Sequence, residues 1–336
     1  MCGQTKIYFD ARWIGPTGIG RFATVLEKSL KLIPLDMSGS PVSISDPIRF
    51  LCAILLKTKP GSLVFSPGFN APLWIPRDFI FCIMDLNHID RPENSNALKR
   101  IYYRLIIRSA VRKSVATLTI SEYFRERIAN WASVHPSKIV NVSCGVEDRF
   151  TPDAIPRSDL GKYFLCVSNR KKHKNEFRII EGFANADLHP DVKLVFTGKI
   201  TSELFGHCRR YHLDSRVIFI GHVLEDDLPS LYTGAIALIF PSLYEGFGLP
   251  AVEAMACGTP VLTSNTTALP EVTGDAALLV DPTSVDEISE GISRLWADEW
   301  LRLDLRNKGI ERAKKFRWDD VVSKVKSALQ PDLGTT

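Results

Sequence analysis

The chain has 336 residues, of which 45% are hydrophobic and 24% are charged, and its formal net charge is +4. This length suits two domains of ordinary size, each with its own core, and the composition is ordinary for a soluble globular protein. The net charge is too small to indicate nucleic-acid binding, so we expect no nucleic-acid partner.

The cysteines indicate reduced thiols. There are seven, scattered and without a CxxC pair, which disfavours both a disulfide framework and a zinc site. Cys2 follows the initiator Met directly, so we expect no secretory signal. No apolar run approaches the length that crosses a bilayer, and the longest candidate, 50–56, is the size of a core segment. A cytoplasmic protein is therefore expected.

Short apolar runs alternate with helical stretches along the whole chain. The strands predicted in the first half are 6–10, 63–66, 79–84, 116–120 and 139–142, and the helices there are 21–32, 48–57, 97–113 and 121–131. The strands predicted in the second half are 163–167, 193–197, 217–220, 235–240, 260–263 and 277–280. This alternation predicts an α/β fold with parallel sheets covered on both faces, whose ligands bind outside the carboxyl ends of the strands.

A linker is predicted at 148–160. The segment, DRFTPDAIPRSDL, has two prolines, several charges and little apolar periodicity. We therefore predict an N-terminal domain over 1–150 and a second domain over 151–318. The remaining segment, 319–336, is predicted to hold one helix and a tail.

A glycine-rich turn follows the first predicted strand. The segment 10–22, DARWIGPTGIGRF, contains Gly15, Gly18 and Gly20 and leads into a predicted helix. The spacing is not GxGxxG, and a glycine-rich turn alone is a weak signal. A tight turn without a ligand explains it equally well.

The predicted helix 97–113 is basic. It carries Lys99, Arg100, Arg104, Arg108, Arg112 and Lys113, while 94–121 contains no acid. The four arginines recur every fourth residue and share one stripe, and the apolar side chains expected opposite them are Tyr102, Leu105, Ile106 and Ala110. Such a helix fits peripheral contact with anionic lipid. It also fits an ordinary surface helix, and the two interpretations are compatible.

A basic loop follows the strand predicted at 163–167. Residues 169–175 read NRKKHKN. A fixed cation at a strand end suits a diphosphate leaving group, because negative charge builds there as the bond to the sugar breaks. The alternative is a solvated basic turn.

Glu245 and Glu253 frame the segment EGFGLPAVE, which follows a predicted buried strand within 234–242. Pro250 fits the first turn of a helix over 249–256, and the glycines let the backbone approach a ligand closely. The free N–H groups and dipole of a helix start attract an anion, and carboxylates accept hydrogen bonds from sugar hydroxyls. The segment therefore predicts a nucleotide-sugar site, against the alternative of two solvated glutamates.

Residues 244–260 and 268–281 strongly resemble the retaining nucleotide-sugar glycosyltransferases of family 4, bacterial surface-polysaccharide mannosyltransferases in particular. The Glu-x7-Glu motif of that family is matched by Glu245 and Glu253. The resemblance is most specific over 167–318 and weaker over 10–150. It implies the GT-B architecture, in which two Rossmann-like domains with parallel sheets face a central cleft and the last helix crosses back to the first domain.

The resemblance also implies roles for individual residues. Glu245 would contact the donor sugar and Glu253 the ribose. Lys174 matches a family lysine that acts on the diphosphate, and Arg170 is the candidate for the neighbouring arginine. The backbone amides implied to bind the diphosphate belong to Gly246, Phe247, Gly248 and Leu249.

The N-terminal half departs from the family at one position. Gly18 and Gly20 match a loop that closes over the diphosphate. Met84 stands where many members have a histidine that holds the donor sugar, whereas Asp85 is kept as a candidate catalytic residue. His88 is a possible substitute for the missing histidine.

The function implied is transfer of a hexose, mannose from GDP-mannose above all, to a glycan or lipid-linked glycan in polysaccharide biosynthesis. UDP-glucose stays open as the donor. Two rivals also stay open: a nucleotide-sugar-binding relative that has lost turnover, and a sugar-nucleotide epimerase. No DxD follows a strand and no cluster has metal-ligand spacing, so we expect neither a metal nor another cofactor.

Overall fold

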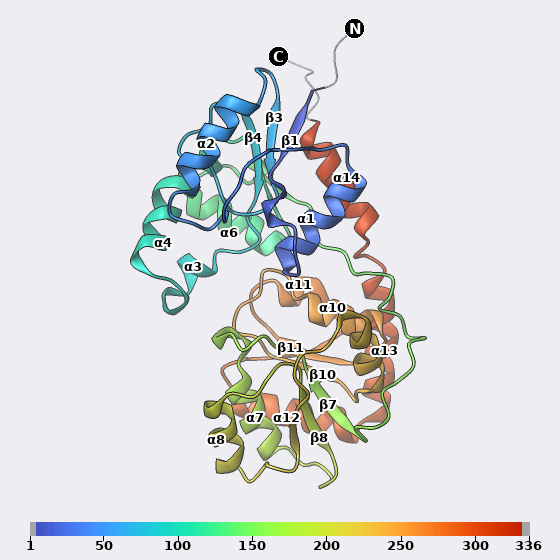
Figure 1. The fold of residues 1–336 in the computed structure, drawn as a ribbon. Coiled ribbons are helices and arrows are strands. Elements are labelled where there is room, and N and C mark those ends of the chain that lie inside the picture. Colours follow the sequence, from blue (N-terminus) through green and yellow to red (C-terminus); the bar gives the residue numbers. More distant parts are fainter. Residues whose placement is uncertain (1–4, 331–336) are drawn as a thin grey trace. The chain divides into compact units, whose positions relative to one another are not determined.

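The computed structural model describes residues 5–330, which form two compact units (Figure 1). The first unit contains the described residues up to Gly145 together with the last helix, α14 (Trp318–Leu329), and the second contains Val146–Arg317. The segment predicted as a linker belongs to the second unit, where the ring of Phe150 is buried and lies edge-on to Tyr232. Residues 331–336 of the predicted tail lie outside the described residues, as does Cys2.

The first unit is a parallel sheet of six strands in the order β2-β1-β3-β4-β5-β6. The strands are β1 (Ile7–Phe9), β2 (Ile33–Pro34), β3 (Leu63–Ser66), β4 (Asp78–Cys82), β5 (Ala116–Thr119) and β6 (Ile139–Asn141). Its longer helices are α1 (Gly18–Ser29), α2 (Asp46–Lys57), α4 (Ala97–Tyr102), α5 (Arg108–Lys113) and α6 (Glu122–Ala132). Short helical turns are η1 (Ala11–Trp13), α3 (Asn87–Asp90), η2 (Pro92–Asn94) and η4 (Pro136–Lys138).

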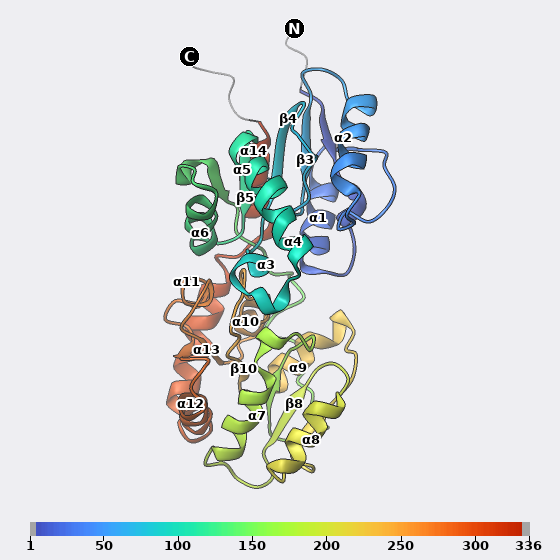
Figure 2. The same ribbon diagram turned by 90° about the vertical axis from the view of Figure 1, so that its left-hand side faces the viewer.

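Helices cover both faces of this sheet. In parallel sheets the crossovers are right-handed, so a reversal of strand order moves the connecting helix to the other face. Strand order reverses after β2, and accordingly α1 and α14 pack together on one face while α2, α4 and α5 lie on the other (Figures 1 and 2). Buried on both faces, β3 is apolar from Leu63 to Phe65.

The second unit repeats the plan with the strand order β12-β11-β10-β7-β8-β9. Its strands are β7 (Tyr163–Cys166), β8 (Lys193–Phe196), β9 (Val217–Phe219), β10 (Leu238–Phe240), β11 (Val261–Ser264) and β12 (Leu278–Val280). Its helices are η5 (Lys172–Lys174), α7 (Glu176–Asn185), α8 (Ser202–Arg210), η6 (Glu225–Asp227), α9 (Leu228–Gly234), α10 (Leu249–Ala256), α11 (Leu269–Thr273), α12 (Val285–Ala297) and α13 (Glu299–Ala313). One core cluster joins α7, α8, α12 and the sheet around Phe164, Phe183 and Ile288.

The strand order places one ligand crevice in each unit. In open parallel sheets, ligands bind outside the carboxyl ends of the strands where the order reverses. In the second unit that position lies between β7 and β10, and in the first between β1 and β3. The predicted donor-site segments 169–175 and 245–249 follow β7 and β10, and the glycine-rich segment 10–22 follows β1.

The structure differs from the sequence-based predictions at four elements. Strand β2 was not predicted, and β10 is shorter than 235–240. Helix α1 begins at Gly18 rather than at residue 21, because the Thr17 hydroxyl caps it by accepting a hydrogen bond from the Gly20 N–H at 3.0 Å. The predicted helix 97–113 is α4 and α5 joined by a π-helical turn, η3 (Tyr103–Ile107).

Candidate functional site

The start of α10 presents its backbone N–H groups beside the end of β10. Gly248 precedes the helix with φ of +101°, a conformation that favours glycine, and a Cβ there would lie 2.5 Å from Leu269 Cδ2. No side chain of the described residues caps the helix. Within residues 5–330, no acceptor lies within hydrogen-bond distance of the N–H groups of residues 246–249. This arrangement is a ready anion-binding position.

Phe247 contributes to this segment through its backbone. Its ring is 4% exposed and packs edge-to-face on Phe316, with the ring centroids 5.4 Å apart. That contact holds the turn before α10 against the chain at Phe316. Gly246 and Leu249 are partly exposed on either side of the buried pair Phe247 and Gly248.

Lys174 and Glu245 meet at the carboxyl ends of β7 and β10. The Lys174 Nζ lies 2.7 Å from Glu245 Oε1, and the two side chains are only 10% and 13% exposed. The ammonium also lies 4.6 Å from the centroid of the Phe240 ring, which favours a cation electrostatically. The structure therefore brings together two residues that lie 71 positions apart in the sequence and were predicted to share one site.

The loop that carries Lys174 is held by its own side chains. Asn175 adopts a left-handed conformation, with φ of +62°. Its Nδ2 donates to the carbonyl oxygens of Pro241, at 3.0 Å, and Pro282, at 2.6 Å. The Leu243 N–H donates to the His173 carbonyl oxygen at 2.8 Å. The loop after β7 is thus fastened to the loop after β10, which holds the backbone of Lys174 at this site.

Glu253 lies within the first turns of α10 and is 5% exposed. The hydroxyl of Tyr232, a fully buried residue of α9, donates to Glu253 Oε2 at 2.9 Å. Sequence reasoning missed Tyr232, because only the packing of α9 against α10 brings the two residues together. This hydrogen bond holds the carboxylate in a single orientation.

The guanidinium of Arg170 is committed to contacts within the protein. Its Nε donates to the Lys199 carbonyl oxygen at 2.8 Å, and its Nη2 donates to the carbonyl oxygens of Thr197 and Gly198 at 2.5 and 2.8 Å. Its Nη1 forms an ion pair with Glu176. Because its N–H groups already have partners within the protein, Arg170 is the predicted donor contact that the structure supports least. Its hydrogen bonds favour a structural role.

The predicted residues of the first unit have different surroundings. Asp85 is half-buried and accepts a hydrogen bond from the Asn87 N–H at 2.9 Å. His88 lies edge-on to the rings of Phe69 and Tyr103, with centroid distances of 6.4 and 5.7 Å. These ring contacts show that His88 packs against neighbouring aromatic side chains.

Gly18 and Gly20, at the start of α1, differ in whether the structure has space for a side chain. A Cβ on Gly20 would lie 2.1 Å from the Gly15 carbonyl oxygen, so close approach of the backbone demands glycine there. A Cβ on Gly18 would meet no atom within 4 Å. Packing within the described chain therefore explains Gly20 but not Gly18.

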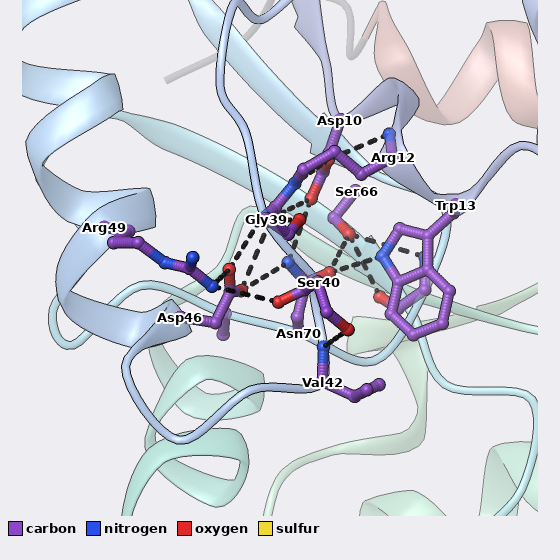
Figure 3. Close-up of polar contacts among 12 residues, drawn as sticks. Asp10, Arg12, Trp13, Gly39, Ser40, Val42, Asp46, Arg49, Ser66 and Asn70 are labelled. Carbon is purple, nitrogen blue, oxygen red and sulfur yellow. Dashed lines mark hydrogen bonds and ion pairs between the residues drawn. The ribbon is translucent and has the colours of Figure 1, made fainter.

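A buried polar network fills the crevice of the first unit (Figure 3). Arg12 forms ion pairs with Asp10 at 2.7 Å and Asp46 at 2.5 Å, and both carboxylates are fully buried. The Asn70 Nδ2 donates to both carboxylates, at 2.9 and 3.0 Å, while its Oδ1 accepts from the Trp13 indole N–H at 2.7 Å. Sequence reasoning missed this network, although Asp10 and Arg12 lie in the segment that it singled out.

The contacts of Arg12 keep its guanidinium charged, and the two carboxyl groups beside it make this crevice unfavourable for phosphate. Burial alone lowers the pKa of Arg12, but its hydrogen bonds to Asp10 and Asp46 and their charges outweigh burial and raise that pKa above its ordinary value. A phosphate entering this crevice would meet two buried carboxylates. Of the two crevices, the one between β7 and β10 therefore suits a diphosphate better.

The described residues contain no group of three or more His, Cys, Asp or Glu side chains placed to hold a metal ion. The six described cysteines are free thiols, and five of them are buried. Burial raises the pKa of the Cys257 thiol to about 12 and that of Cys208 to about 11, which keeps both protonated and unreactive near neutral pH. In the part of the chain that the structure describes, no helix has the length and apolarity needed to span a bilayer.

The comparisons with known proteins agree with this geometry. Residues 149–316, half of the chain, match the family described as glycosyl transferases group 1. The chain belongs to this glycosyltransferase family. It is accordingly a hexosyltransferase, and the unit that matches the family carries Lys174, Glu245 and Glu253. The prediction from residues 244–281 is confirmed at the level of the family.

Named relatives of this glycosyltransferase include mannosyltransferases. It is 29% identical over 283 residues to O-antigen chain mannosyltransferase B of Escherichia coli, covering 79% of this chain and 73% of that protein. It is 42% identical over 214 residues to the MMP alpha-(1->4)-mannosyltransferase of Mycolicibacterium hassiacum, covering 61% of this chain and 51% of that protein. These relatives place the chain among enzymes of glycosyl transfer, in a family with roles in polysaccharide biosynthesis.

The fold has solved counterparts. The structure of Anabaena HepE in complex with UDP-glucose aligns with a TM-score of 0.76 at 17% identity, over 97% of this chain and the whole of that one. Together with the two parallel six-stranded sheets, this alignment confirms the predicted α/β, Rossmann-like GT-B fold.

Proposed function

We propose that this glycosyltransferase moves mannose from GDP-mannose to a glycan or lipid-linked glycan in polysaccharide biosynthesis, with retention of the anomeric configuration. The observation that carries the proposal is the pairing of Lys174 with Glu245 beside the N–H groups of residues 246–249, which have no acceptor among the residues that the structure describes. The mannosyltransferases among its relatives support mannose as the sugar.

The diphosphate of the donor would bind at the start of α10. Its oxygens would accept hydrogen bonds from residues 246–249, where the helix dipole adds to the attraction. The Lys174 ammonium would turn from Glu245 toward the bridging phosphate oxygen, because both acceptors lie within reach of one mobile side chain. Glu245 would then be released to accept hydrogen bonds from hydroxyls of the transferred sugar.

Transfer would break the bond between the sugar C1 and the leaving phosphate oxygen, and form a bond between C1 and the acceptor oxygen on the same face. The proton of the acceptor hydroxyl would pass to the leaving phosphate. Negative charge on the diphosphate grows during this step, so Lys174 would stabilise the transition state more than the bound donor.

The remaining residues have supporting roles in this proposal. Glu253, held by Tyr232, would accept hydrogen bonds from the ribose hydroxyls. Gly18, Gly20 and Asp85 of the first unit stay candidate substrate contacts. Arg170 would keep the loop after β7 in place. We propose that no metal or other cofactor takes part, since Lys174 and the helix start supply positive charge, and that the protein works in the cytoplasm.

The proposal is tested by donor binding and turnover. The protein is incubated with GDP-mannose, UDP-glucose and ADP-glucose, each with and without octyl α-D-mannopyranoside. Release of nucleotide is followed by chromatography and the product anomer by NMR. We expect GDP-mannose to raise the melting temperature most, because a ligand that binds only the folded state stabilises it, and to give an α-linked product.

Other outcomes would point to the rivals. Preference for UDP-glucose would correct the donor. A new sugar nucleotide formed without acceptor would indicate an epimerase. Donor binding without hydrolysis or transfer would indicate a relative that has lost turnover. Met84, which stands where many family members have a histidine, is the reason to consider this rival. If none of the donors raised the melting temperature, the proposed site would be wrong.

A further inference from the structure

The helical segment α4-η3-α5 has two apolar stripes, one of which faces outward. The inward stripe consists of Tyr103, Ile107 and Ala110, which are at most 3% exposed. The outward stripe consists of Leu98, Ile101 and Leu105, which are 61%, 52% and 63% exposed. Of the predicted apolar face, Ala110 is buried and Tyr102 and Ile106 are partly buried, whereas Leu105 belongs to the outer surface, so the prediction is wrong for Leu105.

The outward stripe is continuous along the helix. Residues spaced by three, four and seven positions lie on one face of a helix, and Leu98, Ile101 and Leu105 have this spacing. Single exposed apolar residues are normal on protein surfaces. A row of large aliphatic side chains on the solvent-facing side of a helix instead indicates an interaction surface.

Uncompensated positive charge borders this stripe. Among the described residues, no carboxylate lies within ion-pair distance of any of the six basic side chains of residues 97–113. Arg108 and Arg112 donate to Ser133 Oγ and to the Ala132 carbonyl oxygen, neither of which carries a charge. Arg100 and Arg104, next to Ile101 and Leu105, are exposed.

A loop that contacts the helix also exposes large apolar side chains. The Ala71 N–H donates to the Tyr102 hydroxyl at 3.3 Å, so the chain at residue 71 lies against α4. Just beyond it, Leu73 and Trp74 are 46% and 52% exposed. Tryptophan favours the boundary between lipid headgroups and acyl chains, because its ring is apolar and its N–H is polar.

We propose that the outward face of α4 and η3, with the loop at residues 73–74, docks onto the surface of an anionic phospholipid bilayer. Arg100, Arg104 and the neighbouring bases would pair with lipid phosphates. Leu98, Ile101 and Leu105 would enter the boundary between headgroups and acyl chains. The segment 94–121 combines a row of aliphatic side chains with bases and no acid, which complements an anionic bilayer, whereas two copies that met through this segment would bring like charges together.

The docking face lies on the side of the first sheet that is covered by α2 and α4, opposite α1 and α14 (Figures 1 and 2). The inference extends the proposed function, because an enzyme that acts on a lipid-linked glycan needs to meet its acceptor at a membrane. It does not depend on the donor or on turnover.

The test is co-sedimentation with vesicles in the absence of any donor. Vesicles of phosphatidylcholine alone are compared with vesicles of phosphatidylcholine and phosphatidylglycerol. The unchanged protein should bind the anionic vesicles and not the neutral ones. Both the Arg100→Glu/Arg104→Glu variant and the Leu98→Ser/Ile101→Ser/Leu105→Ser variant should bind at least about tenfold more weakly. The charge variant should also lose most of the salt dependence.

A matched control lies on the opposite face of the same unit. Lys324 and Lys326 are exposed on α14, and the Lys324→Glu/Lys326→Glu variant should bind anionic vesicles within about twofold of the unchanged protein. Hydrolysis of GDP-mannose in free solution should be equal in all three variants. A loss there would concern the proposed function and not the docking face.

Three outcomes would overturn the inference. The first is equal binding to neutral and anionic vesicles. The second is unchanged binding by both docking-face variants, or an equal loss in the α14 control. The third is a dimer, seen by analytical ultracentrifugation, that the serine variant dissociates while vesicle binding persists. That outcome would assign the apolar stripe to self-association.

Discussion

The proposed chemistry depends most on the ammonium of Lys174, and the substitution Lys174→Met removes it while keeping the aliphatic stem. The charge lies 2.7 Å from Glu245 and 4.6 Å from the centroid of the Phe240 ring, in a site where Lys174 and Glu245 are both largely buried. Removing one preorganised group that stabilises developing negative charge costs roughly 10²–10³ in kcat, or about 3–4 kcal/mol. We expect kcat to fall by that factor and the dissociation constant of the donor to change by less than about tenfold.

The same substitution affects stability, and this effect is separable. It leaves Glu245 without its ion-pair partner in a site that retains some solvent contact, so we expect a loss of about 1–3 kcal/mol in the free energy of unfolding. The double variant Lys174→Met/Glu245→Gln should recover most of that loss without recovering turnover. Denaturant titration and steady-state kinetics on both variants separate folding from chemistry.

Lys172 provides a matched control. It belongs to the same loop, is exposed, and forms no ion pair with a described carboxylate. Lys172→Met should leave kcat within about threefold, because an exposed charge is screened by solvent. The reasoning is refuted if Lys174→Met keeps kcat within the same threefold range while the protein remains folded, or if the Lys172 variant loses as much.

Four further predictions concern Arg170, the ribose site, the glycines of α1 and the absence of a metal requirement. Arg170→Met should lower the free energy of unfolding by about 2–4 kcal/mol, since three carbonyl oxygens and an acid lose their donor; a drop in kcat at unchanged stability would argue for a direct role. Glu253→Gln should weaken GDP binding by about 1–3 kcal/mol in calorimetry and Tyr232→Phe by about 1, with no effect if the ribose binds elsewhere. Gly20→Ala should lower the melting temperature clearly, whereas Gly18→Ala should leave it equal or higher, and reversal of that order would contradict the packing at Gly15. Chelation with EDTA should leave the transfer rate within about twofold, and restoration of a lost rate by Mg²⁺ or Mn²⁺ would show that a cation assists the leaving diphosphate.

The sequence was sufficient to predict what depends on local pattern. Buried parallel strands are short apolar runs, so β3 at 63–66 and helix α10 at 249–256 have the predicted bounds. The motif residues Lys174 and Glu245 follow neighbouring strands, and the rule that ligands bind at the carboxyl ends of strands was enough to expect them together. The two-residue strand β2 contains Pro34 and is too short to give a periodic signal.

Two errors in the predicted helices have different causes, one local and one tertiary. Glycines lower helix propensity, which hid the start of α1, although the Thr17 cap was visible in the sequence. The orientation of the helical segment 97–113 depends on Tyr103, whose ring packs against Phe69, His88 and Trp131, and a π-helical turn there shifts the face that follows. No helical period reveals such a shift.

Arg170 illustrates a different limit. A basic side chain in a loop after a strand reads as a ligand contact when nothing else is known. The carbonyl oxygens of 197–199 that receive its N–H groups follow β8, and they reach Arg170 only because β7 and β8 are neighbours in the sheet. The ion network of Arg12 in the first unit was hidden for the same reason, since Asp46 and Asn70 come from distant segments.

The measurement that tests the central claim most directly is a crystal structure of the protein with GDP-mannose or GDP. The account predicts that the diphosphate oxygens lie within hydrogen-bond distance of the N–H groups of residues 246–249, with Lys174 Nζ turned from Glu245 to the phosphate and Glu253 on the ribose. A nucleotide bound elsewhere, or one that leaves the ion pair of Lys174 and Glu245 intact and the start of α10 empty, would contradict it.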